Sequence, residues 1–228
     1  MPVRGDQGIE LAAGVQGWVS RAAYKLVAAL ETFGPDGLEV AGKRCFDVGA
    51  AAGGFTQVLL RRGAREVVAV DVGHGQLSDE VADDPRVIQR SGVNIRDARA
   101  GDLGGPAALL VADLSFISLR LVLPVLRDLV EPNGDLVLLV KPQFEIGRHR
   151  LGKGGIVRSP RDRAAVIEQV VAAATKVGLN AQGLCASPIR GTTGNAEYLL
   201  WLTPRPDQGL TTAQVTALAA TLSTEALS

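Results

Sequence analysis

Cysteine is scarce in this sequence, and no cysteines are paired in a metal-binding or disulfide pattern. Only Cys45 and Cys185 occur among 228 residues, and each lies in an apolar run outside any Cys-x-x-Cys or Cys/His group. Such isolated cysteines are typical of buried thiols in a reducing compartment. His74 and His149 also have no partner at metal-ligand spacing. The sequence therefore predicts neither a disulfide framework nor a bound metal ion.

Long apolar runs and an excess of one charge are missing as well. No run approaches the roughly 18 apolar residues that span a bilayer, and no charged and apolar leader opens the chain. The 24 basic and 24 acidic residues cancel, so any nucleic acid must be bound by a local patch. With 46% hydrophobic and only 4% aromatic residues, the chain has ample side chains for one globular core. We expect a cytoplasmic protein without a membrane partner; the composition predicts no oligomeric state.

Short β-rich runs alternate with helical patterns, which favours an α/β fold with a mostly parallel sheet covered on both faces. Seven strands are predicted, at 44–48, 66–71, 86–89, 108–113, 135–141, 180–186 and 197–202. Helices are expected at 55–62, 118–130 and 161–176. A further helix is expected before the first strand, with Ser20 as its cap and an apolar stripe from Ala23 to Phe33. The loop 187–195 is too short for a crossover helix, so the last two strands should form an antiparallel hairpin. This is the plan of a Rossmann-like methyltransferase.

The domain organisation follows from the same patterns. We expect one methyltransferase domain at 20–204, preceded by a linker segment at 1–19 and followed by a tail or helix at 205–228. Val215, Leu218 and Leu222 lie at helical spacing in this tail, which indicates a packing helix or a mobile end rather than a site.

The stretch DVGAAAGGFT, from Asp47 to Thr56, follows the first predicted strand and opens a helix, which indicates a loop that approaches a nucleotide. Its glycines fit neither the G-x-G-x-x-G dinucleotide fingerprint nor the phosphate loop with its lysine. A carboxylate at the strand end, Asp47, would repel a pyrophosphate but favour the ammonium and sulfonium groups of S-adenosylmethionine. Asp71 ends the second strand, where it can accept hydrogen bonds from ribose hydroxyls. Asn94 follows the third strand and faces either the adenine or only its own turn.

These considerations predict an S-adenosylmethionine site. Its predicted residues are Asp47, Gly49, Ala51, Gly53, Gly54, Phe55, Asp71, Val72, Asn94 and Asp113.

Charged residues adjoin three of the most apolar predicted strands. Asp113 ends the fourth strand, Lys141 ends the fifth and Glu197 opens the seventh, and such residues are usually kept for a site. The carboxyl ends of parallel strands share an edge with the amino end of an antiparallel strand, so the three can meet beside the cofactor. Lys25 would complete a Lys-Asp-Lys-Glu set if its helix leans over that edge, although the residue pattern alone favours a solvated lysine. The stretch DLSF at 113–116 also echoes the D-P-P-Y loop of base amino-methyltransferases, which remain an alternative.

Six motifs stand in the chain in this order: VSRAAYKL, DVGAAAGGFTQVLL, DVGHGQL, VADLSFISL, LLVKPQFE and GNAEYLLWL. In order and spacing they resemble the TlyA-like proteins, called the hemolysin A family, and more distantly the FtsJ-like RNA 2′-O-methyltransferases. The resemblance implies methylation of ribose 2′-hydroxyls in ribosomal RNA, with Lys25, Asp113, Lys141 and Glu197 matching the family's catalytic tetrad. Family members usually begin with a small RNA-binding module, which is expected to be missing because nothing upstream of Val3 has room for it. The older family name leaves a membrane-active protein as a second alternative.

In the reaction so implied, the ribose hydroxyl must be held in line with the methyl group and lose its proton, and Lys141 is the candidate for that task. Contact with ribosomal RNA or a ribosomal subunit requires local positive charge. The window 141–163 has seven basic residues against two acidic ones and is rich in glycine, which predicts a mobile basic loop. Its predicted RNA contacts are Arg148, Arg150, Lys153 and Arg158.

Overall fold

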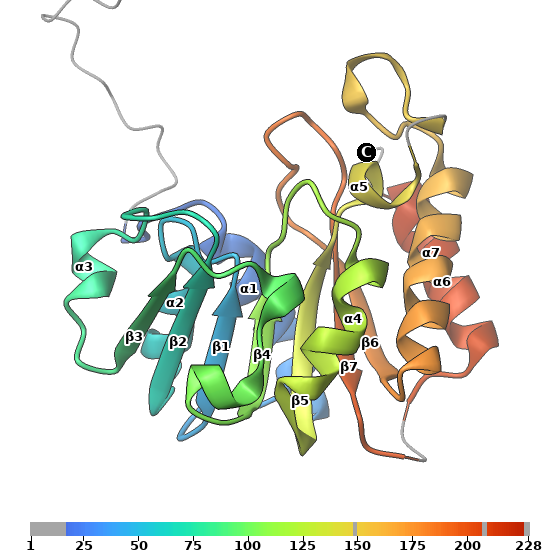
Figure 1. Ribbon diagram of the computed structural model, residues 1–228. Coiled ribbons are helices and arrows are strands. Elements are labelled where there is room, and N and C mark those ends of the chain that lie inside the picture. The colour runs from blue at the N-terminus through green and yellow to red at the C-terminus, as the bar shows by residue number, and fades with distance from the viewer. Residues whose placement is uncertain (1–16, 148–149, 207–208, 226–228) are drawn as a thin grey trace, which may run out of the picture.

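The computed structural model describes residues 17–147, 150–206 and 209–225. Within these ranges the chain folds around a seven-stranded sheet in the order β3-β2-β1-β4-β5-β7-β6 (Figure 1). The strands are β1 (Arg44–Val48), β2 (Glu66–Asp71), β3 (Val87–Ser91), β4 (Ala107–Ala112), β5 (Val130–Val140), β6 (Asn180–Ala186) and β7 (Tyr198–Thr203). Strands β1 to β5 pair in parallel, whereas β7 is antiparallel to both β5 and β6. The predicted α/β plan with an antiparallel last strand is confirmed.

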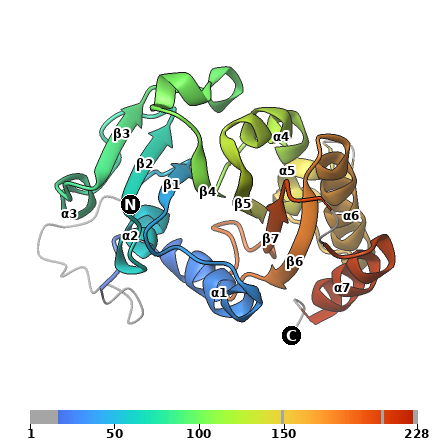
Figure 2. The same ribbon diagram turned by 90° about the horizontal axis from the view of Figure 1, so that it is seen from below.

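Helices cover both faces of this sheet (Figure 2). They are α1 (Ala23–Phe33), α2 (Gly54–Arg61), α3 (Asp79–Ala82), α4 (Leu119–Asp128), α5 (Pro142–Glu145), α6 (Pro160–Lys176) and α7 (Thr212–Glu225), with short 3-10 turns η1 (Gly34–Asp36), η2 (Ile95–Asp97), η3 (Ala100–Leu103) and η5 (Lys153–Gly155). Alternating strand residues divide the core into two layers. Leu109 and Val111 of β4 pack with α1 and α2, whereas Leu110 packs with α4, α6 and α7.

The differences from the predicted elements have local causes. Helices α3 and α5 are four residues long, too short to produce a periodic pattern in the sequence. Strand β5 begins at Val130, before the turn-like residues 131–134, because Val130 pairs with Ala107 ahead of a shift in register. Such pairing depends on the neighbouring strand and is invisible in the segment itself.

Both flanks of the predicted domain pack onto it where they are described. Val19 N–H donates to Gln57 Oε1 of α2 at 2.8 Å. Helix α7 packs on α6 and β6, with Val215 and Ala219 buried, so the predicted tail is a packing helix. The rest of the predicted linker, residues 1–16, lies outside the described residues. Among the described residues, no helix is long and apolar enough to cross a membrane.

Asp47 of β1 is an acid buried in the apolar interior, with no exposed surface. Its Oδ2 accepts a 2.6 Å hydrogen bond from Thr56 Oγ1, and its Oδ1 has no hydrogen-bond partner among the described residues. Burial raises the pKa of Asp47 to about 7, against the lowering effect of the hydrogen bonds from Thr56. Asp47 therefore links β1 to the first turn of α2 through a hydrogen bond, and its burial makes the ionised form of the carboxyl group unfavourable.

Replacing Asp47 by Asn should change how the stability of the fold depends on pH. The folded-state pKa of about 7 lies above the ordinary value of 3.8, so between these values the folded protein keeps a proton that the unfolded chain releases. This contribution to stability is complete at low pH and is lost as the pH rises through about 7. We expect the unfolding temperature of the parent, relative to that of Asp47→Asn, to fall between mildly acidic and neutral pH and then to level off. A difference that stays constant with pH would contradict the buried neutral acid.

Candidate active site

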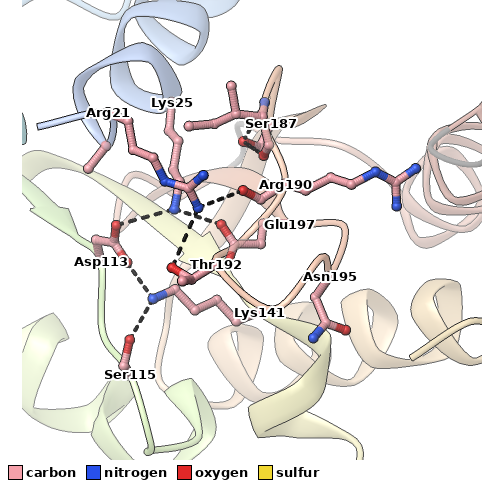
Figure 3. A network of polar contacts seen from close by, with 12 residues as sticks. Arg21, Lys25, Asp113, Ser115, Lys141, Ser187, Arg190, Thr192, Asn195 and Glu197 are labelled. Atoms are coloured by element: carbon pink, nitrogen blue, oxygen red, sulfur yellow. Dashed lines mark hydrogen bonds and ion pairs between the residues drawn. The ribbon is translucent and has the colours of Figure 1, made fainter. Parts of the chain in front are cut away.

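The candidate site lies at the sheet edge where β1, β4 and β5 end and β7 begins. Asp113 follows β4, Lys141 follows β5 and Glu197 directly precedes β7. The antiparallel register of β5 and β7 places Lys141 and Glu197 at neighbouring cross-strand positions. Helix α1 packs on one face of the sheet, and its first turn contributes Lys25 to the site from above (Figure 3). The topology therefore brings all four predicted tetrad residues to one place.

The four side chains form a chain of ion pairs. Lys25 Nζ lies 2.7 Å from Glu197 Oε2 and 3.5 Å from Asp113 Oδ2. Lys141 Nζ lies 2.6 Å from Asp113 Oδ1, so one carboxylate is shared by two lysines. Each of the four side chains is at most 15% exposed, and water therefore screens these charges only weakly.

The two lysines differ in their surroundings. Lys25 contacts two carboxylates, whereas Lys141 contacts one carboxylate and donates a hydrogen bond of 2.7 Å to the neutral Oγ of Ser115. Two anions stabilise a positive charge on Lys25 more than one anion does on Lys141. Lys141 is therefore the better candidate for an amine that loses and accepts a proton.

Two cavities meet at this cluster. The first, of about 270 Å³, is lined by the tetrad, by the start of α1 and by the glycine loop after β1. The second, of about 490 Å³, lies over the ends of β1, β2 and β4. Gly49, Ala51, Asp113 and Ser115 line both cavities. A molecule in one cavity can therefore meet a molecule in the other at Asp113 and Ser115.

Most of the predicted cofactor residues line these cavities. Gly54 and Phe55 line the first, and Asp71, Val72 and Asn94 line the second, in addition to the shared Gly49, Ala51 and Asp113. Asp71 also accepts hydrogen bonds from the backbone N–H groups of Ala51, at 2.9 Å, and Gly73, at 2.8 Å. Asn94 caps η2 by accepting a hydrogen bond from Arg96 N–H. Asn94 thus forms a turn and lines the cavity, so both interpretations of this residue remain compatible with its position.

Asp47 and Gly53 line neither cavity, so their contact with the cofactor stays a prediction. The carboxyl group of Asp47 is buried and accepts a hydrogen bond from Thr56. Gly53 has a φ of 91°, and a Cβ there would lie 2.8 Å from Leu77 Cδ1. The turn and the packing therefore require glycine at this position.

The loops around the cavities contain close approaches and unusual backbone conformations. A Cβ on Gly49 would lie 2.6 Å from the carbonyl oxygen of Asp113, so only glycine allows the ends of β1 and β4 to touch. Ala51 and Phe116 have φ values of 45° and 64°, a left-handed conformation that non-glycine residues rarely adopt. Both line the second cavity, and such strained residues cluster at functional sites.

The predicted basic loop carries less free charge than its composition indicates. Arg148 and the side chain of Lys153 lie outside the described part of the chain. Arg158 is exposed, and Arg150 pairs with Asp162. Arg163 is 2% exposed, and its guanidinium donates to the carbonyls of Val157, Arg158 and Ser223, which ties the loop to α7. Arg163 is therefore not available to a ligand on the surface.

Part of this loop is anchored by hydrogen bonds to Asn195, and the predicted mobility of the loop stays a prediction. Asn195 is buried; its Oδ1 accepts a hydrogen bond from Val157 N–H at 2.9 Å, and its Nδ2 donates to the Gly155 carbonyl at 2.8 Å. Because Asn195 lies two residues before Glu197, it fixes the loop relative to the tetrad. The motif GNAE contained this residue, but nothing in the sequence indicated its partners.

Two further residues at the site were not predicted. Arg21 lines the first cavity four residues before Lys25, and its guanidinium donates to the carbonyl of Arg190 at 3.0 Å. The helical i, i+4 spacing was the signal that could have found it. Glu145 is buried and accepts hydrogen bonds of 2.5 Å from Leu119 N–H and Ser118 Oγ, so it clamps the loop after β4 to the turn after β5.

With this geometry in place, the comparisons with known proteins are informative. The chain is 49% identical over 193 residues to the 16S/23S rRNA (cytidine-2′-O)-methyltransferase TlyA of Mycobacterium tuberculosis, covering 85% of this chain and 71% of that protein. A candidate hemolysin from Streptococcus thermophilus has a solved structure with a TM-score of 0.86 and 38% identity, covering 97% of this chain and 76% of that one. An S-adenosylmethionine-dependent methyltransferase from Mesorhizobium loti shares the fold, with a TM-score of 0.54 at 14% identity and coverage of 77% and 97%.

The family comparison agrees with the motifs and with the position of the tetrad. The FtsJ-like methyltransferase family matches residues 18–203, which include the glycine loop and all four tetrad residues. The chain belongs to the FtsJ-like methyltransferase family.

Proposed function

We propose that this protein transfers a methyl group from S-adenosylmethionine to ribose 2′-hydroxyls of ribosomal RNA. The observation that carries the proposal is the pair of lysines sharing Asp113 at the junction of two cavities. One cavity suits a cofactor and the other presents a base to a hydroxyl. The 49% identity to an rRNA (cytidine-2′-O)-methyltransferase supports the choice of ribose in ribosomal RNA.

The second cavity fits S-adenosylmethionine in size and in chemistry. Its volume of about 490 Å³ is within the range of ligand pockets. The Asp71 carboxylate, which keeps lone pairs beyond those used by the backbone, would hold the ribose hydroxyls. Val72, 69% exposed, offers an apolar wall for the adenine, with Asn94 nearby on the same cavity. When bound, S-adenosylmethionine supplies a methyl group that the adjoining sulfonium makes electrophilic.

The first cavity would receive the ribose that is methylated. Lys141 takes the proton from the 2′-hydroxyl, a weak acid that becomes nucleophilic as the proton leaves. Asp113 stabilises the ammonium that forms on Lys141. Lys25, held in place by Glu197 and Asp113, offers a positive charge to the developing negative charge on the ribose oxygen. These roles require both lysines, in different protonation states, beside one carboxylate.

A base amino group is a poorer acceptor for this site. An exocyclic amino group is a hydrogen-bond donor and has to be held by acceptors. The DLSF loop does supply Asp113, but both oxygens of that carboxylate are already within ion-pair distance of lysines. A basic amine and a cationic lysine beside the reacting group suit a hydroxyl that loses its proton better than an amino group that becomes positive.

Lys141→Ala and Asp71→Ala should separate the chemical step from cofactor binding. We expect Lys141→Ala to lower single-turnover transfer to ribosomal RNA by roughly 10²- to 10⁴-fold, because a general base is lost. Its affinity for S-adenosylmethionine, measured by calorimetry, should stay close to that of the parent. Asp71→Ala should instead weaken cofactor binding strongly. The product of the parent should resist alkaline cleavage at the methylated nucleotide, since only ribose methylation blocks that reaction.

Lys176→Ala, which removes an exposed lysine at the end of α6, is the matched control and should behave as the parent. An alkali-labile product would move the proposal to base methylation. Undiminished single-turnover transfer by Lys141→Ala would remove Lys141 from the chemistry.

We also propose that the basic loop contacts RNA phosphates through Arg148, Arg150, Lys153 and Arg158; the structure describes the side chains of Arg150 and Arg158 among these. The loop follows Lys141 in the chain and lies beside the tetrad end of the sheet, where yellow ribbon rises above the strands in Figure 1. Arg21 lines the first cavity from the other side. An RNA strand that places its ribose in this cavity would therefore pass between basic groups.

The double variant Arg150→Ala/Arg158→Ala should bind RNA more weakly, and the log–log salt dependence of its affinity should be shallower by about one to two units. Arg61→Ala/Arg62→Ala removes the same charge from the far end of α2, next to the start of β1, and is the matched control. Filter binding over a range of salt concentrations measures both slopes. Loss of slope in the α2 variant alone would place the RNA surface there instead.

A further inference from the structure

We propose that Ser115 is a positioning residue, whose hydroxyl turns the Lys141 amine so that its lone pair faces the substrate hydroxyl. This inference rests on the proposed function, in which Lys141 is the base. Ser115 is the serine of the DLSF stretch. Neither the sequence pattern nor the charges of the tetrad explain why a serine stands there.

The two polar contacts of Lys141 differ in kind. Its Nζ donates a hydrogen bond to Ser115 Oγ at 2.7 Å. The approach to Asp113 Oδ1 at 2.6 Å is an ion pair without hydrogen-bond alignment. An ion pair attracts in every direction, whereas a hydrogen bond fixes the direction of one N–H. Among the contacts of Lys141 in the described part of the chain, the one to Ser115 therefore sets the rotation of the amine.

The geometry of a neutral amine explains why this rotation matters. Such an amine has two N–H groups and one lone pair in a tetrahedral arrangement. When one N–H is donated to Ser115 and the other is drawn toward Asp113, the lone pair takes the remaining direction. Lys141 lines the first cavity, where the ribose would bind, and the lone pair is thereby available to a hydroxyl there. Without Ser115 the amine rotates, and its lone pair is aimed at the substrate only part of the time.

Ser115 is itself held firmly enough to act in this way. Glu145 ties the neighbouring Ser118 and Leu119 to the turn after β5, and the Phe116 ring packs on Phe144 with 5.2 Å between centroids. These contacts join the loop that carries Ser115 to the segment that follows Lys141. Ser115 also lines both cavities, so its hydroxyl lies at the boundary between cofactor and substrate.

The other charged groups around Lys141 come from three elements. They are Lys25 of α1, Asp113 after β4 and Glu197 before β7, and the Phe144 ring lies 5.9 Å from Lys141 Nζ. None of them is altered by a change at Ser115. A neutral hydroxyl orients the amine without adding a second anion that would keep the proton on it. This accounts for serine rather than an acid at this position.

Lysine NMR tests the inference without depending on activity. The chain has five lysines, at positions 25, 43, 141, 153 and 176, so the side-chain signals of lysine-labelled protein can be assigned with single Lys→Arg variants. In Ser115→Ala the amine loses the acceptor that fixes its direction, and the order parameter of the Lys141 amine, measured by NMR relaxation, should fall. Ser115→Thr, which keeps the hydroxyl, should restore it. Ser118→Ala, which removes a contact that holds the same loop but keeps the Ser115 hydroxyl, should lower it less than Ser115→Ala does. An unchanged order parameter in Ser115→Ala would overturn the inference.

Single-turnover transfer supplies the second readout. At saturating RNA and cofactor, we expect Ser115→Ala to lower the rate roughly 10- to 100-fold and to move the acid limb of its pH profile to lower pH, with recovery in Ser115→Thr. If Ser115 had only a structural role, the rates of Ser115→Ala and Ser115→Thr would fall alike and the acid limb of the pH profile would not move. That result would refute the inference. If the parent itself forms no alkali-resistant product, the proposed function fails, while the lysine NMR measurement still decides whether Ser115 orients Lys141.

Discussion

The carboxylate of Asp113 holds the charged site together. It lies between the amino groups of Lys25 and Lys141, which would otherwise repel each other in a poorly hydrated cavity. Its own position depends on Gly49, because the backbone of Asp113 approaches that residue too closely for any side chain. The same contact brings the glycine loop to the end of β4, where the two cavities meet. The glycine loop and the Asp113 carboxylate are thus positioned by one close approach between two strand ends.

The sequence carried the information that depends on topology. Parallel strands place their carboxyl ends at one edge, so Asp113, Lys141 and Glu197 could be brought together from strand order alone. The alternation of strands and helices, and the short loop before Glu197, predicted the sheet and its antiparallel last strand. Lys25 was a different case, because only the resemblance to a family indicated that its helix leans over the edge. The motif DVGAAAGGFT located a loop that lines both cavities but did not indicate which of its residues face them.

Side-chain partners distant in sequence were beyond such reasoning. Ser115 is 26 residues from Lys141, and Asn195 is 38 residues from Val157; no local pattern encodes either contact. The prediction for Asp47 rests on the attraction of a carboxylate for a cationic cofactor, but the sequence does not indicate that this side chain is fully buried, with its pKa raised to about 7 by that burial. Arg163 was counted as surface charge, although α7 covers it. Burial of a charged group has to be compensated by particular neighbours, and composition does not reveal them.

The place of β7 in the sheet bears on how the protein is made. This strand is last in the chain, yet it lies between β5 and β6 and delivers Glu197 to Lys25. During synthesis, the segments of β5 and β6 leave the ribosome before β7, the strand that lies between them in the sheet. The sheet has an internal gap until residue 203 is synthesised, and the pairing that fills it spans segments nearly 60 residues apart, as in Val140 with Tyr198. Lys25 therefore gains its Glu197 partner late in synthesis, and no nascent fragment that ends before Glu197 contains the tetrad.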